Sequence, residues 1–134
     1  MENNNELLRE NSIDCSIVVP VYQNEGSLEK IFKKLKDHVI DKNPQYSVEV
    51  IFVDDGSTDK SFHVLKKLYD TYPELIVIVK LTRNFGTYPA LIAGYEKARG
   101  KCIVNVFADL QDPPELIDEM LNYHFKENFN IVIC

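Results

Sequence analysis

The sequence predicts a three-layer α/β/α sandwich built around a mostly parallel β-sheet. Short runs rich in β-branched residues, at positions 16–21, 48–53, 75–81 and 102–107, alternate with segments that have the apolar spacing of helices. The runs are continuously apolar, which is typical of strands buried on both faces of a parallel sheet. Alternating strands and helices imply βαβ crossovers, which place helices against such a sheet. A further run at 130–134 predicts one more strand.

The helices are predicted from start and stop signals as well as from spacing. Ser27 is a suitable N-cap for the first helix. The second helix ends before Pro73, the third begins at Pro89 and stops at Gly100, and the fourth follows the double proline at 113–114. The apolar stripe of the first helix consists of Leu28, Ile31, Phe32, Leu35 and Val39.

Length and composition limit the class of protein. A chain of 134 residues has room for one domain, and we expect residues 1–15 to be a flexible lead-in and residues 16–134 to form that domain. The net charge of -6 repels polyanions and argues against sequence-independent nucleic-acid binding. Cys15, Cys102 and Cys134 lie far apart without a CxxC pair. This spacing predicts reduced thiols in a cytoplasmic protein rather than a zinc site or a disulfide framework.

The polar segments that follow the strands are the candidate functional site. They read YQNEGS, DDGSTD, TRNFGTYP and ADLQDPPE, and we call them the first, second, third and fourth loops. In open parallel sheets, ligands bind at the carboxyl ends of the strands, where these loops meet. The sequence has no GxGxxG or GxxxxGK[ST] motif, which disfavours a dinucleotide or P-loop site.

The second loop places two carboxylates side by side. The Ser57–Asp59 part is common turn and capping chemistry, so we expect it to begin the next helix. Adjacent carboxylates at Asp54 and Asp55 repel each other unless a donor or a cation lies between them. We therefore favour a functional role for Asp55.

The fourth loop offers oxygen ligands for a hard cation. Asp109 and Gln111 are two residues apart in an extended segment, so their side chains point the same way. Mg²⁺ or Mn²⁺ is commonly held by one or two such oxygens, with water and substrate phosphate completing the shell. Asp112 is expected to cap the helix that follows.

Together the four loops resemble, in order and spacing, the nucleotide-binding half of family 2 glycosyltransferases of the GT-A fold. The resemblance rests on SIVVPVYQNEGSL, VIFVDDGSTD, LTRNFGTYPALIAGYEKARG and FADLQDPPE and covers residues 16–134. The last two segments are most similar to the polyprenyl-phosphate glycosyltransferase branch, relatives of dolichol-phosphate mannose synthase. The resemblance implies metal-assisted, inverting transfer of a sugar from a UDP- or GDP-linked donor, with a polyprenyl phosphate as acceptor.

The resemblance also implies roles for residues of the first and second loops. Pro20, Tyr22 and Glu25 match the positions that enclose the nucleotide base and ribose. Val53 and Asp55 match the pair that contacts the base, with Asp55 accepting a hydrogen bond from a base N–H. The first loop departs from the family pattern, since it reads PVYQNE where PVYNE is usual, and this changes the register of Glu25.

The third and fourth loops correspond to the phosphate side of the family's site. Arg83 is the implied phosphate contact. Ala108 and Asp109 match the end of the Asp-X-Asp signature, and Asp109 with Gln111 match the ligands of the Mg²⁺ or Mn²⁺ ion that bridges the donor diphosphate. Phe107 stands where the signature has its first Asp, so one acidic contact to the donor is missing.

The acceptor side of such enzymes follows the point at which this chain stops. We therefore expect the chain to bind a donor without turning it over, and the full-length protein to act at the cytoplasmic face of the membrane. We expect the predicted strand at 130–134 to leave an unfinished sheet edge that can pair with another chain, which favours a homo-oligomer.

Two other functions are compatible with the same residues. Phe107 in place of an acid favours a non-catalytic nucleotide-sugar-binding or interaction module on the transferase scaffold. A Mg²⁺-binding receiver-like domain also groups carboxylates at strand ends, but its acidic pair follows the first strand. Here the acidic pair, Asp54 and Asp55, follows the second strand.

Overall fold

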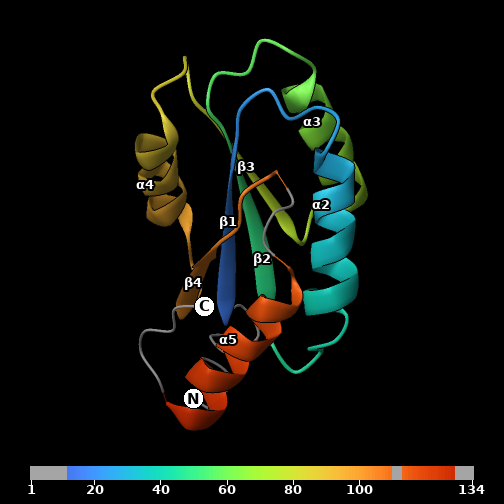
Figure 1. Cartoon of the computed structure of the whole chain (residues 1–134), viewed down its shortest axis with the longest axis vertical. Coiled ribbons are helices and arrows are strands. Elements are labelled where there is room, and N and C mark those ends of the chain that lie inside the picture. The colour runs from blue at the N-terminus through green and yellow to red at the C-terminus, as the bar shows by residue number, and fades with distance from the viewer. Residues whose placement is uncertain (1–11, 110–112, 129–134) are drawn as a thin grey trace, which may run out of the picture.

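The computed structural model describes residues 12–109 and 113–128 (Figure 1). Within these ranges no helix is both long enough and apolar enough to cross a bilayer. The predicted strand at 130–134 lies outside the described residues. The elements, in chain order, are β1 (Cys15–Val21), α2 (Leu28–Leu35), the π-helical turn η1 (Lys36–Ile40), β2 (Val48–Asp54), α3 (Ser61–Thr71), β3 (Ile76–Lys80), α4 (Thr87–Lys97), β4 (Cys102–Asn105) and α5 (Glu115–Glu127).

The four strands form one parallel sheet in the order β3-β2-β1-β4. Helices α2, α3 and α5 cover one face and α4 covers the other, which confirms the predicted three-layer sandwich (Figure 1). The chain moves outward from β1 through β2 to β3 and then returns to place β4 on the other side of β1. Open parallel sheets bind ligands where the strand order reverses in this way. The reversal lies between β1 and β4.

The larger core lies between the sheet and the three helices of the first face. Every residue of the predicted apolar stripe of α2 and η1 is buried, from Leu28 to Val39, because residues at helical spacing share one face of the helix. Leu65 of α3 and Leu121 of α5 complete this core. As predicted, α3 ends before Pro73, at Thr71.

The smaller core lies between α4 and the centre of the sheet. Gly94 allows the close approach, because a Cβ atom at this position would lie 2.5 Å from Cγ1 of Val18. The predicted start of α4 at Pro89 is wrong by two residues, since the helix begins at Thr87. Proline is tolerated throughout the first turn of a helix, where backbone N–H groups have no partner within the helix.

The strand β4 is less buried than its apolar sequence predicts. Burial on both faces holds for β1 and β2, but Ile103 is 44% exposed and Asn105 is also exposed. The reason is that α4 packs on β1 and β2, whereas β4 is an edge of the described sheet. The strand also ends at Asn105, two residues earlier than predicted.

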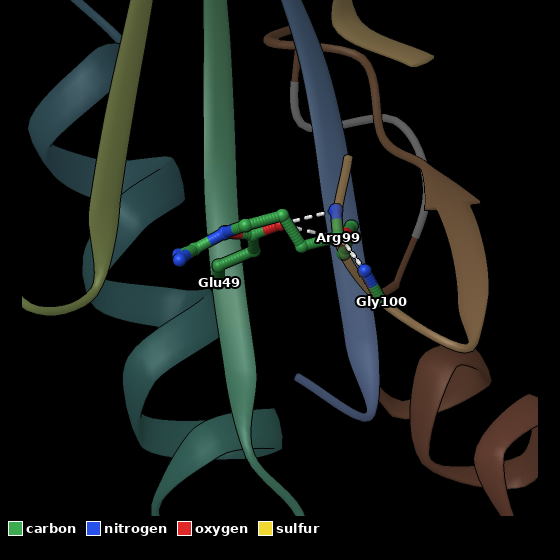
Figure 2. A network of polar contacts seen from close by, with 4 residues as sticks. Glu49, Arg99 and Gly100 are labelled. Atoms are coloured by element: carbon green, nitrogen blue, oxygen red, sulfur yellow. Dashed lines mark hydrogen bonds and ion pairs between the residues drawn. The ribbon is translucent and has the colours of Figure 1, made fainter. Parts of the chain in front are cut away.

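The buried carboxylate of Glu49 holds the segment between α4 and β4 against the sheet through hydrogen bonds (Figure 2). Glu49, on β2, is 1% exposed and accepts hydrogen bonds from the Arg99 guanidinium at 2.8 and 3.1 Å and from the Arg99 backbone N–H at 2.9 Å. Ser16, on β1, donates to Glu49 at 2.8 Å and accepts from the Gly100 N–H at 2.8 Å. Ser16 and Glu49 are near the amino ends of their strands, so this network lies at the end of the sheet opposite to the four loops.

Candidate functional site

A cleft of about 180 Å³ lies at the carboxyl end of the sheet, between the end of β1 and the segment that follows β4. It therefore occupies the place where the strand order reverses, as expected for a ligand site in a parallel sheet. All four loops contribute to it. The lining residues are Pro20, Val21, Tyr22, Asn24, Asp55, Thr87, Phe107, Ala108 and Asp109.

The cleft brings together five of the eight residues proposed from sequence to contact the nucleotide sugar, but not Glu25, Val53 or Arg83. The Val53 side chain is fully buried in the smaller core. Glu25 is exposed, and its backbone N–H donates to Asp59 at 3.3 Å. The Arg83 guanidinium lies over the Phe85 ring, 4.3 Å from its centroid.

Gln23 connects the first loop to the second loop through hydrogen bonds. It has a left-handed backbone conformation, with φ of 54°, and is the extra residue of PVYQNE. Its side-chain oxygen accepts from the N–H groups of Thr58 and Asp59 at 2.8 and 3.1 Å, and its amide nitrogen donates to the Thr58 hydroxyl at 2.8 Å. Its backbone N–H donates to Ser57 at 3.1 Å. This role of Gln23 was not predicted from the sequence, although the extra residue in the motif was its signal.

Asp55 connects the second loop to the third. The residue is 4% exposed, and its two carboxylate oxygens accept from the N–H groups of Phe85 at 2.8 Å and Gly86 at 3.1 Å. The neighbouring Asp54 accepts from the Ser57 N–H at 3.1 Å. Each carboxylate therefore accepts from backbone donors of its own, but the buried Oδ2 of Asp54 has no hydrogen-bond partner in the described part of the chain.

The second and third loops also touch through their backbones. Gly56 has φ of 70°, and a Cβ atom there would lie 2.3 Å from the carbonyl carbon of Arg83. Only glycine fits both the left-handed conformation and this close approach. Asp59 accepts from the N–H of Ser61, the first residue of α3, at 2.9 Å, so the second loop supports the start of this helix, although Lys60 and not Asp59 stands at the N-cap position.

Ser27 connects the first loop to the fourth. It stands at the N-cap position of α2, as predicted, but its side chain makes no capping bond. The hydroxyl instead donates to the carbonyl oxygen of Ala108 at 2.8 Å, so the predicted capping function is wrong. A cap would use the hydroxyl oxygen as an acceptor for an N–H of the first turn, whereas here the hydroxyl donates its proton to the fourth loop.

Phe107 and the start of the fourth loop present one apolar and one acidic side chain to the cleft. Phe107 is 40% exposed and Asp109 is exposed, whereas Ala108 between them is buried. Gln111, the second predicted metal ligand, lies outside the described residues, as does Asp112. The helix that Asp112 was expected to cap begins at Glu115, with Pro114 at its N-cap position.

The donor set fits a divalent cation held jointly with a phosphate ligand. Within residues 12–109 and 113–128, no group of three or more His, Cys, Asp or Glu side chains could hold a metal. Asp55 already accepts two backbone hydrogen bonds, while Asp109 adds an exposed carboxylate to the cleft. Mg²⁺ needs only one or two carboxylates when substrate phosphates and water complete its shell. A cage made by the protein alone does not fit these residues.

The chain is similar to bacterial glycosyltransferases. Residues 16–134 match the sequence model of the family described as Glycosyl transferase family 2. An uncharacterized glycosyltransferase of Synechocystis sp. is 43% identical over 123 residues, or 90% of this chain and 37% of that protein. The undecaprenyl-phosphate 4-deoxy-4-formamido-L-arabinose transferase of Pseudomonas aeruginosa is 35% identical over 106 residues, 79% of this chain and 31% of that protein. The chain thus spans about a third of the length of these curated relatives.

Solved structures share the fold. TarS of S. aureus superposes with a TM-score of 0.70 at 22% identity, over 87% of this chain and 20% of that one. The mannosyltransferase PcManGT of Pyrobaculum calidifontis, solved in complex with GDP-Man and Mn²⁺, gives a TM-score of 0.67 at 25% identity, over 83% of this chain and 31% of that one. From the family match and these superpositions, we conclude that the chain belongs to glycosyl transferase family 2 and has the GT-A fold.

Proposed function

We propose that the chain is the nucleotide-sugar-binding part of a glycosyltransferase whose donor carries UDP or GDP and whose acceptor is a polyprenyl phosphate. The observation that carries the proposal is the cleft at the strand-order reversal, where Pro20, Tyr22, Asp55, Ala108 and Asp109 come together from separate loops. Two relatives support it, since the Pseudomonas enzyme is named for undecaprenyl phosphate and PcManGT was solved with GDP-Man and Mn²⁺.

The base and ribose are proposed to bind on the side of the first and second loops. Tyr22 is 47% exposed at the end of β1 and offers an aromatic surface beside the cleft. A carboxylate has about four acceptor sites, and Asp55 uses two of them for Phe85 and Gly86, so it can still accept from a base N–H. Glu25 is proposed to contribute from the first loop, whereas Val53, which is fully buried in the smaller core, is not among the proposed contacts.

The diphosphate is proposed to bind on the side of the fourth loop. Asp109, with Gln111, would hold a Mg²⁺ or Mn²⁺ ion, and Arg83 would contact a phosphate from the third loop. When bound, such an ion neutralises the negative charge that develops on a nucleoside diphosphate leaving group. Ala108 is buried directly beside Asp109, and its small side chain leaves room for the donor to approach.

The proposed reaction is a single displacement that inverts the configuration at the sugar carbon. A phosphate monoester is largely ionised near neutral pH, so its oxygen can attack without a strong general base. Because the chain spans about a third of its curated relatives, donor binding is the step that we assign to it. The full-length protein is proposed to act at the cytoplasmic face of the membrane, and its self-association stays a prediction.

Calorimetric titration of the chain with UDP and GDP, with and without Mn²⁺, tests the proposal. We expect Mn²⁺-dependent binding of one of the two nucleotides and its loss in Asp109→Asn. Asp70→Asn is the matched control, because Asp70 is an exposed carboxylate on α3 outside the cleft lining. If circular dichroism shows a folded sample and neither nucleotide binds in the presence of Mn²⁺, the proposal is wrong.

A further inference from the structure

Cys15 and Cys102, which are far apart in the sequence, are side by side in the sheet. They are Cα partners across β1 and β4, at the first position of each strand. Neighbouring strands are about 4.8 Å apart, and disulfides join Cα atoms that are about 4.4–6.8 Å apart. Cys15 belongs to the larger core and Cys102 packs against the same core, so both side chains are on one face of the sheet.

The two thiols have different environments. Cys15 is fully buried, whereas Cys102 is half-buried at the edge of the described sheet, and both are free thiols. The hydrogen bond between them raises the pKa of Cys15, as does burial, and lowers the pKa of Cys102 to about 7. The charge of His124 lowers the pKa of Cys102 further, while burial and Asp14 oppose this. At pH 7 about half of Cys102 is thus thiolate beside a protonated Cys15, and in its protonated form Cys102 donates a hydrogen bond to the Asp14 carbonyl oxygen at 3.5 Å.

We propose that Cys15 and Cys102 form a peroxide-sensitive dithiol, which closes reversibly to a disulfide between β1 and β4. A more accessible thiolate beside a second, resolving thiol is the arrangement found in redox-sensitive cysteine pairs. This modification site lies at the amino ends of the strands, at the opposite end of the sheet from the cleft, and it does not depend on the proposed donor binding.

The chemistry requires only hydrogen peroxide and a thiol reductant. The Cys102 thiolate attacks one peroxide oxygen, the O–O bond breaks, and the products are a Cys102 sulfenic acid and hydroxide, which combines with the proton that Cys102 released to the solvent on ionising and becomes water. The Cys15 sulfur then attacks the Cys102 sulfur, the S–O bond breaks, and the Cys15 proton leaves with the hydroxyl group as water. Overall, two thiols are oxidised to one disulfide and one peroxide is reduced to two waters. A thiol such as glutathione reverses the change by exchange.

The disulfide would hold an edge strand in place. The strand β4 leads into the fourth loop, and β1 leads into the first loop, so the cross-link would fix the register of the two strands that frame the cleft. Because the bond is at the far end of both strands, we expect it to raise the melting temperature and to leave the lining of the cleft unchanged.

Peroxide oxidation of the Cys134→Ser chain, followed by peptide mapping, tests the proposal. Cys134 lies outside the described residues, and its removal leaves only the two cysteines in question. We expect a peptide that joins Cys15 to Cys102, with the mass lowered by two hydrogens, restored by dithiothreitol, and accompanied by a higher melting temperature. In Cys15→Ala/Cys134→Ser, we expect Cys102 to stop at a sulfenic acid that dimedone traps.

Two outcomes would overturn the proposal. One is Cys134→Ser protein in which Cys102 is oxidised to the sulfinic acid while Cys15 remains a thiol. The other is a cross-link that joins two chains rather than two strands of one chain. Differential alkylation of the Cys134→Ser protein before and after peroxide shows whether Cys15 and Cys102 are both oxidised, even if the variant that lacks Cys15 does not fold.

Discussion

The Ser27 hydroxyl donates a 2.8 Å hydrogen bond to the carbonyl oxygen of Ala108, across 81 positions of sequence. Ser27 ends the first loop and Ala108 lies in the fourth loop next to Asp109, which lines the cleft. This single bond therefore ties the loop proposed to hold the base to the loop proposed to hold the diphosphate.

Replacing Ser27 with alanine is expected to weaken both stability and nucleotide binding. The change leaves the Ala108 carbonyl without this donor and should cost about 1 kcal/mol of unfolding free energy, measured by urea denaturation. It also frees the fourth loop, so nucleotide affinity should fall. Ser27→Thr retains a hydroxyl and is the control; equal affinities for the alanine and the wild-type chains would show that the bond does not position the loop.

Asp55→Asn is expected to destabilise the chain and to abolish nucleotide binding. An amide has one acceptor oxygen, so it cannot accept from both the Phe85 and the Gly86 N–H groups, and its own N–H₂ group faces one of them. Loss of a buried hydrogen bond to a charged group should cost about 2 kcal/mol in denaturant unfolding. Asp70→Asn is the matched control, because it replaces an exposed carboxylate outside the cleft lining. A variant as stable as the wild type would contradict the inferred role of Asp55.

Phe107→Asp is expected to strengthen Mn²⁺-dependent nucleotide binding. Phe107 is 40% exposed in the cleft, two residues before Asp109, so an acid there adds a second hard oxygen ligand in the described part of the site. A gain of about tenfold in affinity, or about 1.4 kcal/mol, is the scale expected of one added contact. Phe107→Asn serves as the control for size. No difference between the two variants in a Mn²⁺ titration would show that charge at position 107 does not contribute.

Arg99→Met is expected to destabilise the fold without affecting the cleft. The Glu49 carboxylate is 1% exposed and would lose two hydrogen bonds from the guanidinium, while those from Ser16 and from the backbone of residue 99 remain. The cost should be about 2 kcal/mol, because a buried charge loses its counter-charge. A double-mutant cycle with Glu49→Gln isolates the pair. Additive effects in that cycle would mean that the two side chains do not stabilise each other.

Alkylation of Cys102 is expected to follow a pKa near 7. In the Cys134→Ser chain, the iodoacetamide rate at Cys102 should rise through about pH 7, below the ordinary thiol value of about 8.5. Because the pKa of Cys102 is lowered in the folded chain, its ionisation adds to the free energy of unfolding. This contribution is fully present above the ordinary thiol pKa of about 8.5 and is lost as the pH falls through about 7. His124→Gln should move the midpoint upward. A midpoint near 8.5 in the folded chain would contradict the thiol pair as described.

Sequence patterns were sufficient for the architecture and for the location of the site. The periodicity of residues such as Leu28 and Leu35 reports which face of a helix is buried, and continuous apolar runs report buried parallel strands. In a parallel sheet, strand ends meet at one edge, so loops that follow strands in the sequence are brought together in space. The cleft and the family match agree with that prediction.

Sequence patterns were not sufficient for the partners of individual side chains. The bonds from Ser27 to Ala108, from the Phe85 amide to Asp55 and from Gln23 to the second loop each join segments that are 30 or more positions apart. The local sequence around Ser27 is the same whether its hydroxyl caps the helix or binds a distant carbonyl oxygen. Only the packing of the loops distinguishes them.

The sequence by itself therefore determined the α/β/α class and the loops that make the cleft, because these depend on local periodicity and on the order of elements, while the resemblance of the four loops pointed to the family. The tertiary structure alone decided the strand register that pairs Cys15 with Cys102 and the exposure of β4. It also decided that Asp55 supports the third loop as well as lining the cleft. The physical reason is that register, edge position and hydrogen-bond partners are set by contacts between residues distant in the chain.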